Sequence, residues 1–150
     1  SRYSNIAIHM RDAYEGLTAL IPPKEKRGLV LIDPPYEEER DDYAPVVKLL
    51  QKAHAKWPTG MYAIWFPIKQ RRTILHFLRK ATALPVKSAM TIEFLVRPDD
   101  SPLRLNGSGM LLLNPPWQFD RVVGPALPAL RQHLGEPGAS TRLDWLKAPE

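Results

Sequence analysis

The stretch Gly28-Leu29-Val30-Leu31-Ile32-Asp33-Pro34-Pro35-Tyr36 decides the fold class of this chain. Its first half is a short continuous apolar run bounded by turn-forming residues, which is typical of a strand buried on both faces in a parallel sheet. Its second half follows without a spacer and therefore lies at the carboxyl end of that strand. Because α/β sheets bind ligands at the carboxyl ends of their strands, we expect a functional site here.

Apolar runs alternate with amphipathic stretches along the rest of the chain. Strands are expected at 5–10, 28–32, 61–66, 87–96, 110–113 and 143–146, and helices at 13–20, 46–57, 70–83 and 119–134. This order predicts an α/β fold with a three-layer, mostly parallel sheet. The runs 87–96 and 110–113 are joined by a polar loop, which predicts an antiparallel hairpin at one edge of the sheet.

The amino-acid composition restricts the classes of function that the chain can have. The chain has 150 residues, 44% of them hydrophobic, which suits one globular domain with a real core. Its net charge of +5 and pI near 9.6 favour an anionic partner, nucleic acid before membrane. It contains no cysteine, which excludes disulfides and cysteine-ligated zinc. The first residues do not have the layout of a secretory signal, so a cytoplasmic location is expected.

The polar half of the opening stretch points to chemistry on an amine. Two successive prolines fix the backbone and remove two N–H donors, which leaves mainly acceptors. Asp33 and the Pro34 carbonyl can each accept one hydrogen of an exocyclic amine, while Tyr36 stacks on the ring that carries it. This resembles the signature of amino-group methyltransferases that use S-adenosylmethionine. The alternative is a proline-stiffened turn with a solvated aspartate.

A second copy of the pattern, Asn114-Pro115-Pro116-Trp117, follows the apolar run 111–113. If that run is the antiparallel strand of a hairpin, this copy lies at the opposite end of the sheet, which favours the first copy as the active one. The first copy also has an acidic partner upstream. Asp12 could accept the adenine amine of the cofactor, or it could simply be the N-cap of the helix at 13–20.

The charged runs are interpreted from their sign and position. Lys69, Arg71 and Arg72 could contact RNA phosphates, or they could belong to a solvated helix face. The acidic run 37–42 is interpreted as a solvated loop that moves on substrate binding. The four histidines do not have ligand spacing, so no metal site is predicted.

Three blocks, 27–37, 62–67 and 108–117, resemble the RlmJ family of bacterial 23S ribosomal RNA adenine-N6 methyltransferases. The resemblance implies a Rossmann-like sheet, S-adenosylmethionine as cofactor and 23S ribosomal RNA as partner, without metal or membrane. It makes Asp33 the acid–base residue, with Pro34, Pro35 and Tyr36 completing the catalytic motif. Asp12, Ala13 and Asp33 would contact the cofactor, although the family usually has glycine where Ala13 stands.

The resemblance is limited to roughly the C-terminal half of the family. The family's Gly-rich cofactor loop, acidic ribose-binding residue and N-terminal strands have no counterpart in this sequence. Residues 1–150 are therefore expected to be a single domain, the C-terminal part of a catalytic domain, with weak or no activity alone. Guanine-N2 methylation of ribosomal RNA and a non-catalytic nucleic-acid-binding module remain the alternatives.

Overall fold

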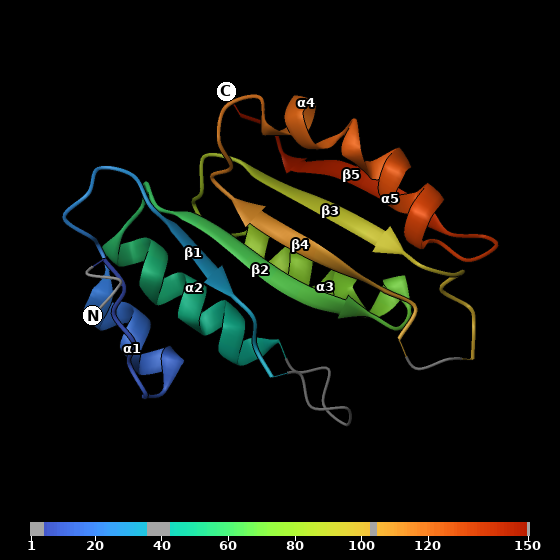
Figure 1. Ribbon diagram of the computed structural model, residues 1–150. Coiled ribbons are helices and arrows are strands. Elements are labelled where there is room, and N and C mark those ends of the chain that lie inside the picture. Colours follow the sequence, from blue (N-terminus) through green and yellow to red (C-terminus); the bar gives the residue numbers. More distant parts are fainter. Residues whose placement is uncertain (1–4, 36–42, 103–104, 150) are drawn as a thin grey trace.

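The computed structural model describes residues 5–35, 43–102 and 105–149 (Figure 1). Its helices are α1 (Ala13–Leu20), α2 (Ala44–Lys56), α3 (Arg71–Thr82), α4 (Phe119–Val123) and α5 (Ala126–Leu134). Its strands are β1 (Leu29–Ile32), β2 (Met61–Ile68), β3 (Ala89–Leu95), β4 (Gly107–Leu113) and β5 (Ser140–Lys147). The α/β class predicted from the sequence is confirmed.

The five strands form one sheet in the order β1-β2-β4-β3-β5. Among the described strands only β1 and β2 pair in parallel, and the pairs β2–β4, β4–β3 and β3–β5 are antiparallel. The mostly parallel sheet was therefore a wrong prediction. The hairpin was correctly expected but wrongly placed at the edge, because β4 pairs on its other side with β2 while β5 lies beyond β3.

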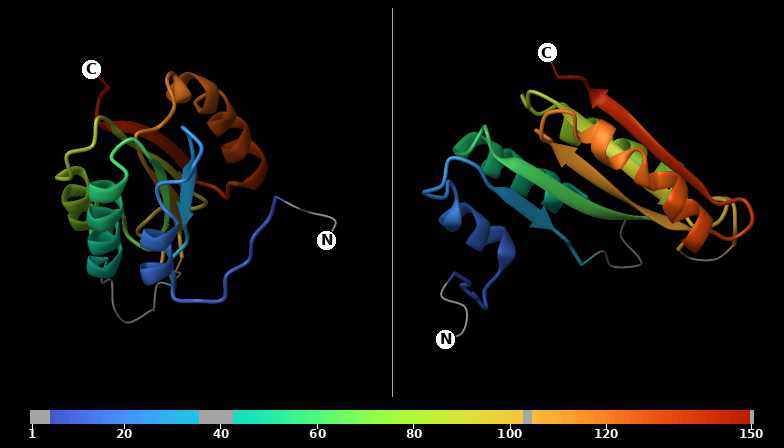
Figure 2. Two further views of the ribbon diagram at one scale, coloured as in Figure 1. Left: turned by 90° about the vertical axis from the view of Figure 1, so that its left-hand side faces the viewer. Right: turned by 45° about the horizontal axis from the view of Figure 1, so that its top comes forward.

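Helices cover both faces of the sheet, which confirms the three layers. Figure 2 shows α1, α2 and α3 on one face, and α4 and α5 on the other. Ile64, Phe66 and Ile68 alternate along β2 and all point toward α2 and α3, where each is fully buried. Phe66 meets Phe77 of α3 edge to face, with ring centroids 6.1 Å apart. This layer between β2 and the two helices is the main core.

The outer face of β1 is left uncovered. Leu29 and Leu31 point away from α1 and α2 and are 62% and 66% exposed. Among the described residues β1 also has a neighbouring strand on one side only. Residues 5–10, predicted as a strand, run outside the sheet without pairing, and Ile8 is 92% exposed. That strand prediction was wrong because a short apolar run forms a strand only where a neighbour completes its hydrogen bonds.

Several element boundaries differ from the predicted ones, and the larger differences have local reasons. The helix predicted over 119–134 divides into α4 and α5 around Gly124 and Pro125, because proline has no N–H to donate within a helix. The strand predicted to end at Phe66 continues through Pro67 to Ile68, and β4 starts at Gly107 so that it matches this length.

Gly109 lets β4 lie close to the core. It pairs with Phe66, and a Cβ atom at this position would be 2.3 Å from Cζ of the Phe66 ring. The Gly107-Ser108-Gly109 cluster therefore has a packing role, because the ring of Phe66 occupies the space that a side chain at residue 109 would need.

We expect Gly109→Ala to lower the free energy of unfolding by about 1–3 kcal/mol, because the added methyl group overpacks against Phe66. Urea denaturation measures the change. Ser108→Ala is the matched control: it lies on the same strand but faces the other side, so it should alter stability by less than about 0.5 kcal/mol. Equal effects of the two substitutions would contradict this explanation.

Candidate functional site

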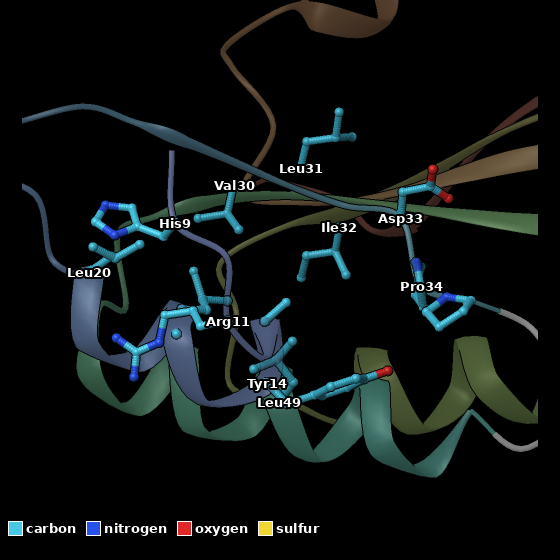
Figure 3. A pocket seen from close by; sticks show the side chains of 14 residues that line it. His9, Arg11, Tyr14, Leu20, Val30, Leu31, Ile32, Asp33, Pro34 and Leu49 are labelled. Carbon is cyan, nitrogen blue, oxygen red and sulfur yellow. The ribbon is translucent and has the colours of Figure 1, made fainter. Parts of the chain in front are cut away.

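A cavity of about 410 Å³ lies between α1 and the carboxyl end of β1 (Figure 3). Residues from three consecutive segments line it, among them Ala13, Tyr14, Leu17, Ile32, Asp33 and Pro34. Val30 and Ile32 point from β1 toward the helices and form its apolar wall. The cavity is therefore at the end of β1 where the sequence predicted a site, and Ala13 and Asp33 share it.

Pro34 holds the Asp33 turn against the protein while the carboxylate stays accessible. Pro34 is buried, whereas Asp33 and Pro35 are exposed. A carboxylate presented in this way can accept hydrogen bonds from a ligand in the cavity. Tyr36, the aromatic member of the motif, and the acidic run 37–42 lie outside the described residues.

Asp12 caps α1. Its Oδ1 accepts a hydrogen bond from the Tyr14 backbone N–H at 2.6 Å, which is the N-cap role weighed for it from the sequence. Asp12 is not among the residues that line the cavity, whereas the adjacent Ala13 is. The cap fixes the first turn of α1, and with it the position of Ala13 and Tyr14.

Tyr14 is a cavity residue that was not predicted from the sequence. Figure 3 shows its ring extending toward the Pro34 end of the cavity. Burial raises the pKa of the Tyr14 hydroxyl, and the Asp12 carboxylate raises it further. The hydroxyl therefore remains protonated near neutral pH and can donate or accept a hydrogen bond. Its place in the first turn after Asp12 was the signal that could have identified it.

The second proline pair lies at the opposite end of the sheet, as its antiparallel strand predicted. Asn114 follows β4 and has a left-handed backbone, with φ of 51°. Its side-chain amide donates to the carbonyls of Pro58 and Gly60, both at 3.0 Å, and its Oδ1 accepts from the Lys87 N–H. Asn114 thus ties together three segments at the end where β2 begins.

The basic run at the start of α3 contains residues in different environments. The Arg71 Nε donates to Oε2 of the buried Glu93 at 2.8 Å, and its Nη2 lies 3.8 Å from Oδ2 of Asp144. Asp99 Oδ2 also accepts from the Arg71 backbone N–H at 3.1 Å. Arg72 is exposed and its Nε donates to Gln70 at 2.9 Å. Arg71 therefore has a structural contact, while Arg72 presents its side chain to solvent.

Asn106 holds the segment that carries these cations. It is 1% exposed, and its side-chain amide donates to the Lys69 carbonyl at 2.7 Å. Its backbone N–H donates to the Ile68 carbonyl at 2.9 Å. The turn from β2 into α3 is thereby fixed at the same end of the sheet as Asp33.

The part of the chain that the structure describes has neither a metal-binding cluster nor a membrane-spanning helix. No group of three or more histidine, aspartate or glutamate side chains there could hold a metal ion. None of the helices in that part combines the length and apolarity needed to cross a bilayer.

The fold and the site together define a class. A mixed α/β sheet that presents an Asp-Pro-Pro turn and a cavity at the carboxyl end of a parallel strand pair is consistent with a methyltransferase domain. A family model described as "Ribosomal RNA large subunit methyltransferase D, RlmJ" matches residues 1–147. The chain belongs to this family of ribosomal RNA methyltransferases, which confirms the resemblance seen in the sequence.

Curated relatives and a solved structure agree with this assignment. The chain is 36% identical to "Ribosomal RNA large subunit methyltransferase J" of Haemophilus influenzae and 33% identical to the protein of that name from Escherichia coli. Each match covers 95% of this chain and 50% or 51% of the relative, so the chain spans about half the length of these relatives. The crystal structure of protein LPL1258 from Legionella pneumophila is similar, with a TM-score of 0.76 and 31% identity over 89% of this chain and 49% of that one.

We expect Arg71→Gln to lower the free energy of unfolding by about 2–3 kcal/mol, because it leaves the Glu93 carboxylate buried without its cation. Arg72→Gln removes the same charge from the neighbouring position and should change stability by less than about 0.5 kcal/mol. Thermal or urea unfolding compares the two variants. If both were equally stable, the Arg71–Glu93 contact would have no structural importance.

Proposed function

We propose that this chain takes part in S-adenosylmethionine-dependent methylation of adenine N6 in 23S ribosomal RNA. The observation that supports the proposal best is the cavity that Asp33 and Pro34 share with the first turn of α1. A family member needs a place for the cofactor next to the groups that hold the target amine, and a cavity lined by Asp33 and Pro34 supports this assignment. The proposed catalytic residues are Asp33, Pro34, Pro35 and Tyr36.

The cavity suits the cofactor in size and lining. Its volume of about 410 Å³ falls within the range of roughly 300–1,000 Å³ usual for small-molecule sites. Leu17 and Ile32 offer apolar surface for an adenine ring, and the Tyr14 hydroxyl and Asp33 carboxylate offer polar contacts. We propose Asp12, Ala13 and Asp33 for cofactor binding: Ala13 and Asp33 line the cavity, and Asp12, as the N-cap of α1, holds Ala13 and Tyr14 in position. When bound, S-adenosylmethionine would supply the electrophilic methyl group.

The motif residues orient the target amine. The Asp33 carboxylate and the Pro34 carbonyl each accept one amine hydrogen, and Tyr36 stacks on the base, which must leave the RNA stack to enter. Drawing on both hydrogens moves the nitrogen lone pair out of conjugation with the ring and aims it at the methyl carbon. The rate gain comes from positioning and electrostatics, without a covalent enzyme intermediate.

Asp33 is also proposed to act as the base that removes a proton after methyl transfer. Methylation leaves the nitrogen with one proton too many, and the Asp33 carboxylate that already accepts from this nitrogen can take it. The exposed position of Asp33 lets that proton pass on to water. Lys69 and Arg72, on the turn that Asn106 fixes at this end of the sheet, are the proposed phosphate contacts, with Arg71 holding the start of α3 in place.

We expect Ala13→Leu to weaken S-adenosylmethionine binding at least about tenfold, because the larger side chain enters the cavity. Isothermal calorimetry measures the change. Ala19→Leu is the matched control: it adds the same atoms to an exposed position of α1 that does not line the cavity, so it should leave the affinity unchanged. Unchanged binding by both variants would place the cofactor elsewhere.

We expect Asp33→Ala to reduce methyl transfer to 23S ribosomal RNA by about 100-fold or more, through loss of the amine acceptor and base. The assay uses the native protein and radiolabelled methyl groups, with circular dichroism to show that the fold is kept. Asp100→Ala removes another carboxylate from an exposed loop at the same end of the sheet and should retain activity. Turnover of Asp33→Ala at the wild-type rate would refute the catalytic assignment.

Identifying the methylated nucleoside shows whether adenine or guanine is the target base. Mass spectrometry of digested RNA should show N6-methyladenosine and no N2-methylguanosine. The reverse result would keep the Asp-Pro-Pro chemistry but assign it to the guanine amine.

A further inference from the structure

A second hollow lies at the far end of the sheet, away from Asp33. Its volume is about 530 Å³. Residues from three segments line it, among them Lys26, Arg27, Thr59, Asn114, Pro116 and Trp117. It lies where β1 and β2 begin and β4 ends (Figure 1). We call it the far hollow, and the proposed methyl-transfer site does not use it.

Trp117 is the main feature of the far hollow. Its side chain is 85% exposed, which is unusual for so large an apolar group. Trp57, by contrast, is buried in the core. An exposed indole offers a flat apolar surface on which the ring of a binding partner can stack.

The backbone around Trp117 is held rigidly. Asn114 and Gln118 on either side both have positive φ, 51° and 57°, in the left-handed region that non-glycine residues rarely adopt. Three hydrogen bonds of the Asn114 side chain hold the turn, and Pro115 and Pro116 stiffen it. Strained backbone kept in place by its surroundings is common at binding sites. The indole is therefore presented in a fixed place before any ligand arrives.

The positive charge around the far hollow favours a partner that carries phosphate. Lys26 and Arg27 both line it and are exposed, and no carboxylate is among its described lining residues. Lys87, whose backbone N–H donates to Asn114, adds an exposed cation beside it. Cations next to a flat aromatic surface suit a phosphate joined to a base, and a site for an apolar protein segment would not need them.

We propose that the far hollow binds an unpaired RNA nucleotide, with its base stacked on Trp117 and its phosphate on Arg27 and Lys26. This rests on the proposed function, because it gives the RNA substrate a second contact. Arg27 of the far hollow and Asp33 lie on either side of β1, six residues apart along the chain, which separates the two sites by about 20 Å. An RNA that contacts both sites must therefore extend along the sheet, and the far hollow would align it for the Asp33 site.

The test is a titration of the chain with a short single-stranded RNA, followed by tryptophan fluorescence and by filter binding. Trp117→Ala should raise the Kd about tenfold, and Trp117→Phe should restore most of the affinity because a ring remains. Arg27→Gln should lower the salt dependence of binding by about 0.7 in logarithmic slope, the value for one single-strand phosphate contact. Arg131→Gln, an exposed arginine on α5, should have no such effect.

The outcomes separate this inference from the proposed function. Wild-type RNA affinity in both Trp117→Ala and Arg27→Gln overturns the inference, even if Asp33→Ala abolishes methylation. In that case the hollow would be left for a protein partner. Loss of RNA binding in these variants with unchanged S-adenosylmethionine binding supports it, even if Asp33 proves not to be catalytic. If the wild-type chain does not bind the single-stranded RNA, the inference is overturned, while the proposed function still stands or falls with the Asp33→Ala assay.

Discussion

The insertion of β4 between β2 and β3 is the constraint on which the rest of this structure depends. β2 has buried side chains on both faces and needs a hydrogen-bonding neighbour on each side, and β4 supplies the second. The strand can come this close because Gly109 leaves room for the Phe66 ring. Its reversed direction sends Asn114 to one end of the sheet while β1 sends Asp33 to the other. The separation of the two proline motifs follows from this single pairing.

Most helices and strands could be predicted from local sequence patterns, but the order of the strands in the sheet could not. The boundaries of α1 matched the prediction because Asp12 caps it and Pro22-Pro23 follows it. An apolar run shows that a strand is buried but does not show which strand lies beside it. The position of β4 depends on a contact between residues 43 positions apart, Phe66 and Gly109, and such a contact leaves no periodic signal. For the same reason, residues 5–10 have a strand pattern but do not pair.

In the candidate site, too, the roles of some residues could be predicted from the sequence and those of others could not. The place of Asp33 followed from its position after an apolar strand, and the capping role of Asp12 from its position before a helix. Tyr14 was missed because its role depends on the cavity, which forms only when α1 lies beneath β1. Arg71 looked the same as Arg72 in the sequence, and only the buried Glu93, 22 residues away, distinguishes them. Roles set by local order were predictable, and roles set by long-range contacts were not.

The uncovered leucines of β1 have a consequence for how the chain behaves in solution. Among the described residues β1 has an unpaired side and an apolar outer face, and such a strand can recruit another copy of itself. The net charge of +5 opposes this, because like-charged molecules repel one another over about a Debye length. Added salt shortens that length to about 3 Å at 1 M and leaves the leucines unchanged. Concentrated samples of this chain should therefore be most dispersed at low ionic strength and should self-associate as salt is added.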